Sequence, residues 1–204
     1  MHVFTRARLG SLLVGLGALL ALVIPAAASA HPGPGAPVVG HVYVNDNTAG
    51  VNTVAVFDRH ADGTLTPASG SPFAAGGAGT GSGLASQGAI QVSPDGRYVL
   101  AVDAGSNQIS VLRIRHDGAL RLVRDGVADS QGSDPVSIAE HDRLVYVANA
   151  GTGGSNYTGF VLTRAGHLLP LPGSTLALPD AAQPGDVLFN STGTNLVGTR
   201  VGTS

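Results

Sequence analysis

The sequence predicts an all-β protein, an incomplete β-propeller of four-stranded antiparallel blades. An Asp-Gly or Ala-Gly turn recurs at positions 62, 117 and 165, spacings of 55 and 48 residues, and a propeller blade typically takes about 40 to 50 residues. The segments around these turns are short runs rich in Val, Ile, Leu and Tyr, which favour strands. No window beyond the amino terminus carries a helical apolar stripe unbroken by Gly or Pro.

The amino terminus, residues 1–30, predicts a secretory signal peptide. A basic start precedes an apolar run over residues 9–24, and Ala28-Ser29-Ala30 provides a cleavage site of small residues. The alternative is an uncleaved membrane anchor, but the run is shorter than the roughly 20 residues of a spanning helix and contains glycines. We therefore expect a secreted, extracellular chain that begins at His31 and keeps no stable membrane anchor.

The amino-acid composition excludes several kinds of chemistry and partner. The chain has no cysteine, so redox chemistry and thiolate metal sites are excluded and stability must come from buried area and strand pairing. Removing 30 of the 204 residues leaves 174, with nine Arg against 13 acidic residues and no Lys. Because this mildly acidic chain has no basic stripe and few aromatic residues, we expect no nucleic-acid partner. We also expect no cofactor and no metal; small molecules, carbohydrates or proteins are the expected partners.

The repeat is clearest in the middle of the chain. Two tight turns, Pro94-Asp95-Gly96 and His116-Asp117-Gly118, help to delimit four short apolar runs. The run over residues 98–102 is apolar on both faces, as a sheet packed between two neighbours requires. The four strands a, b, c and d of this blade are expected at residues 89–92, 97–102, 108–114 and 119–123.

The same order of features divides the rest of the chain. A Pro/Gly-rich segment precedes two full and two partial blades, with expected bounds 31–40 for the segment, then 41–75, 88–128, 134–178 and 185–204. The first partial blade starts on a b-type strand and the last ends on one, whereas closed propellers typically need four to eight blades. We therefore expect a fragment of a longer propeller. Alone, it should be poorly soluble or oligomeric through its open blade edges, for example with two copies sharing one ring.

Propeller connectivity places the short a-to-b and c-to-d turns on one face and the long d-to-a and b-to-c connections on the other. The long connections are rich in Asn, Asp and Gly, and such loops are where propellers usually hold ligands. The alternative is that these residues serve the turns themselves. The binding candidates are Asn45, Asp46, Asn52, Asp103, Asn107, Asp134, Asn149, Asn156, Tyr157 and Asp186, with Asn47, Gln87 and Gln183 on the same face.

Catalytic motifs are absent, and the catalytic residues stay unassigned. His60, His116 and His141 fall in the short turns without metal-ligand spacing, so we interpret them as surface turn residues. No nucleophile elbow is present. The glycine-rich stretch 76–88 lacks the Lys and the helix of a phosphate-binding loop and is expected to be a flexible d-to-a connection. The only Glu, Glu140, lies in an a-to-b turn.

The blade motif resembles that of a known family. Residues 93–102, Ser-Pro-Asp-Gly-Arg-Tyr-Val-Leu-Ala-Val, followed by 107–112, and residues 134–139 with 144–151, resemble the YVTN-like repeat of the lactonase-type seven-bladed propellers. That family includes 6-phosphogluconolactonase-like and carboxymuconate-cyclase-like proteins, and the resemblance covers about residues 40 to 200. In it a carboxy-terminal strand completes the first blade, which would account for the missing strand a. Its catalytic His, Arg and Glu have no counterpart that aligns here.

Two functions follow as hypotheses. One is a secreted lactonase-like propeller that binds or hydrolyses a small polar or sugar-derived molecule at the channel mouth. The other is a non-catalytic extracellular scaffold that binds carbohydrate or protein through the same loops.

Overall fold

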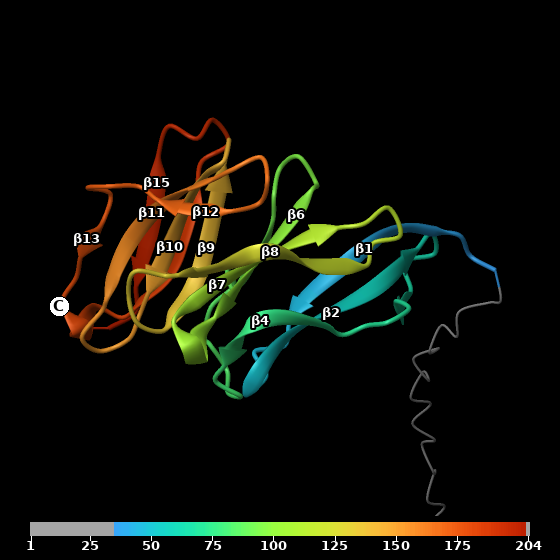
Figure 1. Ribbon diagram of the computed structural model, residues 1–204, viewed down its shortest axis with the longest axis horizontal. Helices are drawn as coiled ribbons and strands as arrows, with labels where there is room; N and C mark the ends of the chain where they lie inside the picture. Colours follow the sequence, from blue (N-terminus) through green and yellow to red (C-terminus); the bar gives the residue numbers. More distant parts are fainter. Residues whose placement is uncertain (1–34, 203–204) are drawn as a thin grey trace, which may run out of the picture. The chain divides into compact units, whose positions relative to one another are not determined.

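The computed structural model describes residues 35–202, and the predicted signal peptide lies outside them. Four antiparallel sheets follow one another along the chain (Figure 1). None of them closes on itself, so the incomplete propeller expected from the sequence is confirmed. Within this part of the chain no helix is long and apolar enough to cross a membrane.

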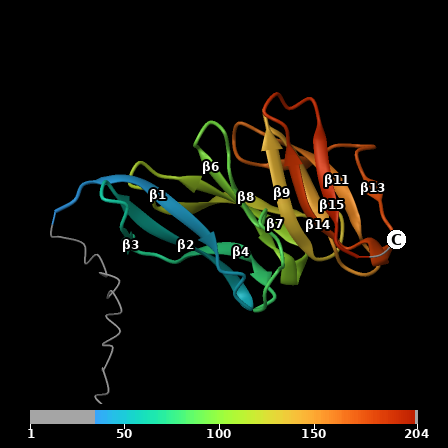
Figure 2. The ribbon, with the colours of Figure 1, turned by 180° about the vertical axis from the view of Figure 1, so that it is seen from behind.

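The first sheet lacks a strand on one side. Its outer strand, β1 (Val38–Asn45), pairs only with β2 (Gly50–His60), as Figure 2 shows. Two short strands, β3 (Leu65–Pro67) and β4 (Phe73–Gly79), both pair with β2 and share the position of the last strand. The described part of the chain therefore supplies the b, c and d strands of this blade and no strand a.

The second and third sheets are complete. The second has the simple order β5 (Ile90–Val92), β6 (Tyr98–Asp103), β7 (Gln108–Ile114) and β8 (Leu120–Asp129). In the third sheet the last position is again shared by two short strands. Its members are β9 (Pro135–His141), β10 (Leu144–Asn149), β11 (Asn156–Leu162), β12 (Leu168–Pro170) and β13 (Leu176–Ala177). The expected c strand of the second blade matches β7 exactly, whereas its d strand continues six residues beyond the expected end.

The fourth sheet is a hairpin of β14 (Pro184–Phe189) and β15 (Leu196–Arg200). In Figure 2, β14 lies beside β9, the first strand of the preceding sheet. Two short 3₁₀ turns, Ala104–Ser106 and Asp180–Ala182, lie in the connections.

Apolar side chains fill the spaces between neighbouring sheets, and β6 shows why. All six of its residues are buried. Tyr98, Leu100 and Val102 pack against the third sheet, while Val99 and Ala101 pack against the first. A strand whose two faces both meet a neighbouring sheet needs apolar side chains on both faces, which explains the apolar run over residues 98–102; the last residue of the strand, Asp103, is buried as well but is hydrogen-bonded.

The repeated turn follows from backbone geometry. Its glycines, Gly63, Gly118 and Gly166, have φ of 86°, 77° and 90°. This left-handed region is costly for residues with a Cβ atom, so glycine is the residue that recurs there.

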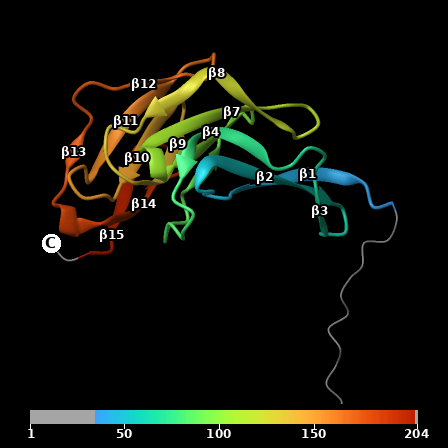
Figure 3. The ribbon, with the colours of Figure 1, turned by 60° about the horizontal axis from the view of Figure 1, so that its bottom comes forward.

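One expectation about a loop is wrong. Residues 76–79 of the glycine-rich stretch form the end of β4, which lies against the second sheet (Figure 3). A Cβ atom on Gly77 would lie 2.5 Å from the Cβ atom of Asp103, and one on Gly76 would lie 2.8 Å from Val127. The glycines allow this close approach of two sheets, and only residues beyond 79 belong to the connection.

The connections separate into two faces, as the strand order requires. The loop face carries the b-to-c and d-to-a connections, which are bound to each other: Asn47 donates to the Ser82 carbonyl, and Asn107 Oδ1 accepts from the Asp134 amide at 2.8 Å. The turn face, at the other ends of the strands, carries the a-to-b and c-to-d turns. We use these two names below.

Candidate functional site

Three of the predicted residues, Asn45, Asn52 and Asp103, form one network on the loop face. The Asn52 amide nitrogen donates to Asn45 Oδ1 at 2.9 Å, to the Val102 carbonyl at 3.0 Å and to Asp103 Oδ1 at 2.9 Å. The Asn45 amide nitrogen also donates to the Val102 carbonyl, at 2.9 Å. Since Asn45 and Asn52 belong to the first sheet and Asp103 to the second, the network joins two blades.

Asp103 is a fully buried carboxylate. Its Oδ2 accepts from the Ser110 hydroxyl at 2.6 Å, and the Gly77 amide also donates to it. Burial raises the pKa of Asp103, and the hydrogen bonds from Ser110, Asn52 and Gly77 oppose that rise without cancelling it. These hydrogen-bond donors stabilise the ionised form of the Asp103 carboxylate, which burial in the apolar core disfavours.

This raised pKa predicts a pH dependence of stability. The folded chain binds the Asp103 proton more tightly than the unfolded chain does. The contribution of this residue to the free energy of unfolding is therefore complete below the ordinary pKa of Asp, and it is lost as the pH rises through the pKa of Asp103 in the folded chain. Asp103→Asn is neutral at every pH, so the wild type should lose stability relative to this variant between about pH 4 and pH 7. Urea unfolding of both proteins across that range measures the difference. Parallel pH curves would contradict the prediction.

A spacing of seven residues marks a pair of polar side chains in each of the first three blades. Asn45 bonds to Asn52, Asp103 to Ser110, and Asn149 to Asn156, each across its own b and c strands. Sequence reasoning found five of these six residues but missed Ser110. The common spacing was the signal that could have identified it.

The third pair also ties loops together. The Asn149 amide nitrogen donates to the Ser130 carbonyl at 3.1 Å, and that of Asn156 donates to the Gln131 carbonyl at 2.8 Å. Both asparagines are buried. The amide nitrogens of this pair therefore donate to backbone carbonyls of the preceding loop.

The remaining candidates differ in how many hydrogen bonds their side chains make within the protein. Tyr157 donates to the Thr199 carbonyl at 2.8 Å, and burial raises its pKa, which the charge of Arg200 opposes. Asp46 is exposed and accepts from the Thr53 hydroxyl at 2.8 Å. Asp134 is half-buried, burial raises its pKa, and no side-chain hydrogen bond to its carboxyl is present in residues 35–202.

Gly88, in the connection before β5, lies against Ser137 of β9 and Asp186 of β14. The Ser137 hydroxyl donates to Asp186 Oδ1 at 2.6 Å, and the Ile138 amide donates to the Gly88 carbonyl at 2.8 Å. A Cβ atom on Gly88 would overlap the Ser137 hydroxyl and lie 2.7 Å from Asp186 Oδ1. Sequence analysis did not single out Gly88 and Ser137, because the glycine-rich stretch and the blade motif that contain them do not show that the two residues meet.

Two open depressions lie on the loop face. The first, of about 630 Å³, is lined by residues 45–49 of one connection and by residues 81–84, 86 and 89 of another. The second, of about 570 Å³, is lined by Gln131, Ser133, Ser155, Asn156 and Asp180 among others. Asn45, Asp46, Asn47 and Asn156 are the sequence candidates that line them; Gln87 and Gln183 do not.

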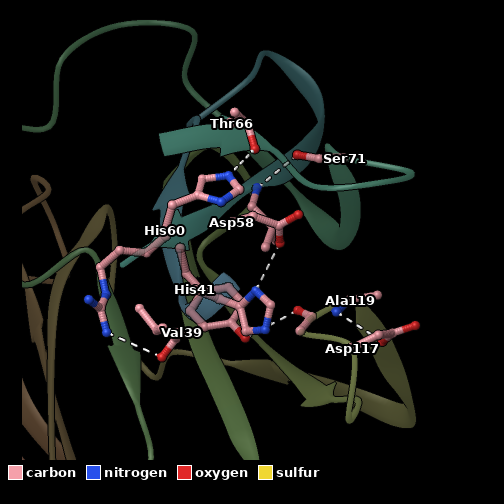
Figure 4. Close-up of polar contacts among 12 residues, drawn as sticks. Val39, His41, Asp58, His60, Thr66, Ser71, Asp117 and Ala119 are labelled. Atoms are coloured by element: carbon pink, nitrogen blue, oxygen red, sulfur yellow. Dashed lines mark hydrogen bonds and ion pairs between the residues drawn. The ribbon is translucent and has the colours of Figure 1, made fainter. Parts of the chain in front are cut away.

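The histidines of the first blade bind protein groups on the turn face. Figure 4 shows His41 directed at Asp58, with Nδ1 3.1 Å from Oδ1, and His60 directed at Thr66, with Nε2 2.8 Å from the hydroxyl oxygen. The other ring nitrogen of His60 lies 2.8 Å from the Ala36 carbonyl. Across residues 35–202 no three His, Asp or Glu side chains are grouped as metal ligands.

Solved structures share this fold. Two candidate 6-phosphogluconolactonases match, one from Bacteroides fragilis (TM-score 0.60, 15% identity, covering 78% of this chain and 47% of that one) and one from Bacteroides uniformis (0.59, 23%, 79% and 47%). A periplasmic gluconolactonase of Pseudomonas aeruginosa also matches (0.52, 20%, 83% and 44%). The chain spans about half the length of these structures. No curated protein matches it.

The family description "Lactonase, 7-bladed beta-propeller" matches residues 44–160, which is more than half of the chain. This range contains the last two residues of β1, the whole of β2 and most of the next two blades, including the three polar pairs. The chain therefore belongs to the family of seven-bladed lactonase propellers.

Proposed function

We propose that the loop face binds a small polar or sugar-derived molecule, as part of a lactonase-type propeller that hydrolyses it. The depression lined by residues 45–49 and 81–89 carries this proposal. Its wall combines the side chains of Asn45, Asp46 and Thr48 with Ser82 and Ser86, a set of amide, carboxylate and hydroxyl groups suited to the hydroxyls of a sugar.

The substrate class to test first is a sugar lactone. Two of the neighbouring structures are described as candidate 6-phosphogluconolactonases and a third as a gluconolactonase. On the loop face, Asp46, Asp134 and Asp186 are carboxylates that could act on a bound water, and burial raises the pKa of Asp134, which makes its carboxylate a stronger base than an ordinary aspartate.

A non-catalytic scaffold is the second candidate, and a specific observation favours it. The polar pairs Asn45 with Asn52, Asp103 with Ser110, and Asn149 with Asn156 are hydrogen-bonded to each other inside the protein. A loop face fixed in this way suits the binding of a carbohydrate or protein without chemistry. Export after cleavage at residue 30 and self-association through open blade edges belong to the proposal for both candidates.

A lactone panel separates the two functions. We expect the full-length chain to open δ-gluconolactone faster than buffer, followed by base uptake in a pH-stat. Asp46→Asn should weaken substrate binding and raise KM by about tenfold, the effect of losing a charge-assisted hydrogen bond. Asp125→Asn, an exposed aspartate with no place on the loop face, is the matched control. Binding without turnover across the panel would support the scaffold. If the panel shows no binding and no turnover, both the lactonase candidate and sugar binding by this depression are contradicted, and only a protein-binding scaffold is left.

A further inference from the structure

A second pocket lies on the turn face, between the second and third blades. Its volume is about 330 Å³, and three turns meet at it: the a-to-b turns of both blades and the c-to-d turn of the third. They bring Arg97, Arg143 and Arg164 to one pocket together with Glu140. The loop face and its depressions share no residue with it.

Two of the three guanidinium groups, those of Arg143 and Arg164, are uncommitted, whereas the Arg97 guanidinium donates to the Arg164 carbonyl at 3.4 Å. Within residues 35–202 Arg97, Arg143 and Arg164 form no ion pair, and the side chains of Arg143 and Arg164 make no hydrogen bond there. Two other carboxylates at the pocket have partners. Asp95 accepts from the Ser93 hydroxyl at 2.7 Å, and Asp142 lies 3.5 Å from His141 Nε2.

Tyr98 holds this arrangement in place. Its buried hydroxyl donates to the Arg164 carbonyl at 2.8 Å and accepts from the Arg113 guanidinium at 2.9 Å. The Arg97 guanidinium lies over its ring, 5.4 Å from the centroid. The backbone of the c-to-d turn is thereby tied to the second blade, and Arg164 is presented at the pocket by a fixed segment.

Glu140 has one oxygen without a donor. Oε1 accepts from the Arg143 amide at 2.7 Å, but Oε2 is buried and has no hydrogen-bond partner in the described part of the chain. A buried carboxyl oxygen without a partner is costly, so a donor supplied by a bound molecule would be stabilising.

We propose that this pocket binds a small carboxylate that carries a hydroxyl or ammonium group beside the carboxyl group. The carboxylate pairs with the guanidinium forks of Arg143 and Arg164, whose planar geometry matches it. The neighbouring donor reaches Glu140 Oε2. The site is separate from the loop face, so it does not depend on lactone hydrolysis.

Three six-carbon carboxylates test the ligand chemistry by calorimetry on the full-length chain. Gluconate has a hydroxyl beside the carboxylate, norleucine has an ammonium group there, and hexanoate has neither. We expect gluconate or norleucine, whichever donor is preferred, to bind at least about tenfold more tightly than hexanoate. The proposal would be overturned if gluconate and norleucine both failed to bind, or if hexanoate bound as tightly as they do.

Variants locate the site. Arg143→Gln and Arg164→Gln should each weaken binding by about tenfold or more, because each removes a charge-assisted pair. Glu140→Gln should remove the preference over hexanoate, since an NH₂ group can then replace the accepting oxygen. The Arg124 side chain is 96% exposed and does not line the pocket, so Arg124→Gln should leave the affinity unchanged. Equal weakening in Arg124→Gln, or undiminished binding in both pocket variants, would contradict the assignment.

Discussion

Replacing Gly88 by Ala is expected to lower the free energy of unfolding by about 3 kcal/mol, because the new methyl group has no room. Its Cβ atom would overlap the Ser137 hydroxyl and lie 2.7 Å from Asp186 Oδ1. Gly88 cannot retreat without breaking the hydrogen bond that its carbonyl accepts from the Ile138 amide. Urea unfolding of the purified variant measures the loss.

Two further variants separate crowding from the general cost of replacing glycine. Gly83→Ala lies in the same connection, has no atom within 4 Å of its built Cβ, and should change stability by less than about 0.5 kcal/mol. Adding Ser137→Ala to Gly88→Ala removes the overlapping hydroxyl, so the double variant should lose less than the sum of the two single changes. Additive losses would show that the contact with Ser137 is not the cause.

Strands were predictable because local sequence determines them. The run over residues 98–102 is apolar on both faces, and the structure buries it between two sheets. The c strand over residues 108–114 is bounded by Asn107, with φ of 57°, and by the turn at Gly118. Such runs and turns carry their signal within a few residues.

Contacts between blades could not be predicted from the sequence in this way. Gly76 and Gly77 read as loop residues, yet their lack of side chains serves the close approach of β4 to Asp103 and Val127. Asp103 and Asn52 were predicted as ligand candidates, whereas the structure buries both and bonds them to each other. The sequence of one blade does not show which residues of the next blade pack against it. An Asn or Asp in a loop can therefore be a ligand-binding residue, a turn residue or a member of a buried hydrogen bond.

The turn-face pocket also depends on contacts between blades that the sequence does not show. Glu140 and Arg143 are turn residues in sequence, and the tight turn explains the bond from the Arg143 amide to Glu140 Oε1. Their meeting with Arg164 depends on the c-to-d turn of the same blade and on Tyr98 of the preceding one. Interblade packing thus determines both candidate binding surfaces of this chain.

Asn52→Ala should give the largest loss, about 3 to 5 kcal/mol, because it removes donors from a buried charge and from buried backbone. The Asn52 amide nitrogen serves Asn45 Oδ1, the Val102 carbonyl and Asp103 Oδ1, and its oxygen accepts from the Thr48 and Thr53 amides. No water can replace these bonds without entering a site that is fully buried. Thermal or urea unfolding at neutral pH measures the effect.

The pH dependence of that loss identifies its cause. The Asn52 hydrogen bond favours the ionised form of Asp103, so its removal should raise the pKa of Asp103 further above the ordinary value. The variant should then lose more stability at pH 7 than at about pH 4, where a larger share of the carboxyl group is protonated. Asn195→Ala, an exposed turn residue, is the control and should stay within about 0.5 kcal/mol of the wild type at both pH values. An equal loss for Asn52→Ala at the two pH values would assign the effect to packing and backbone bonds, and would remove Asp103 from the account of how the first two blades are held together.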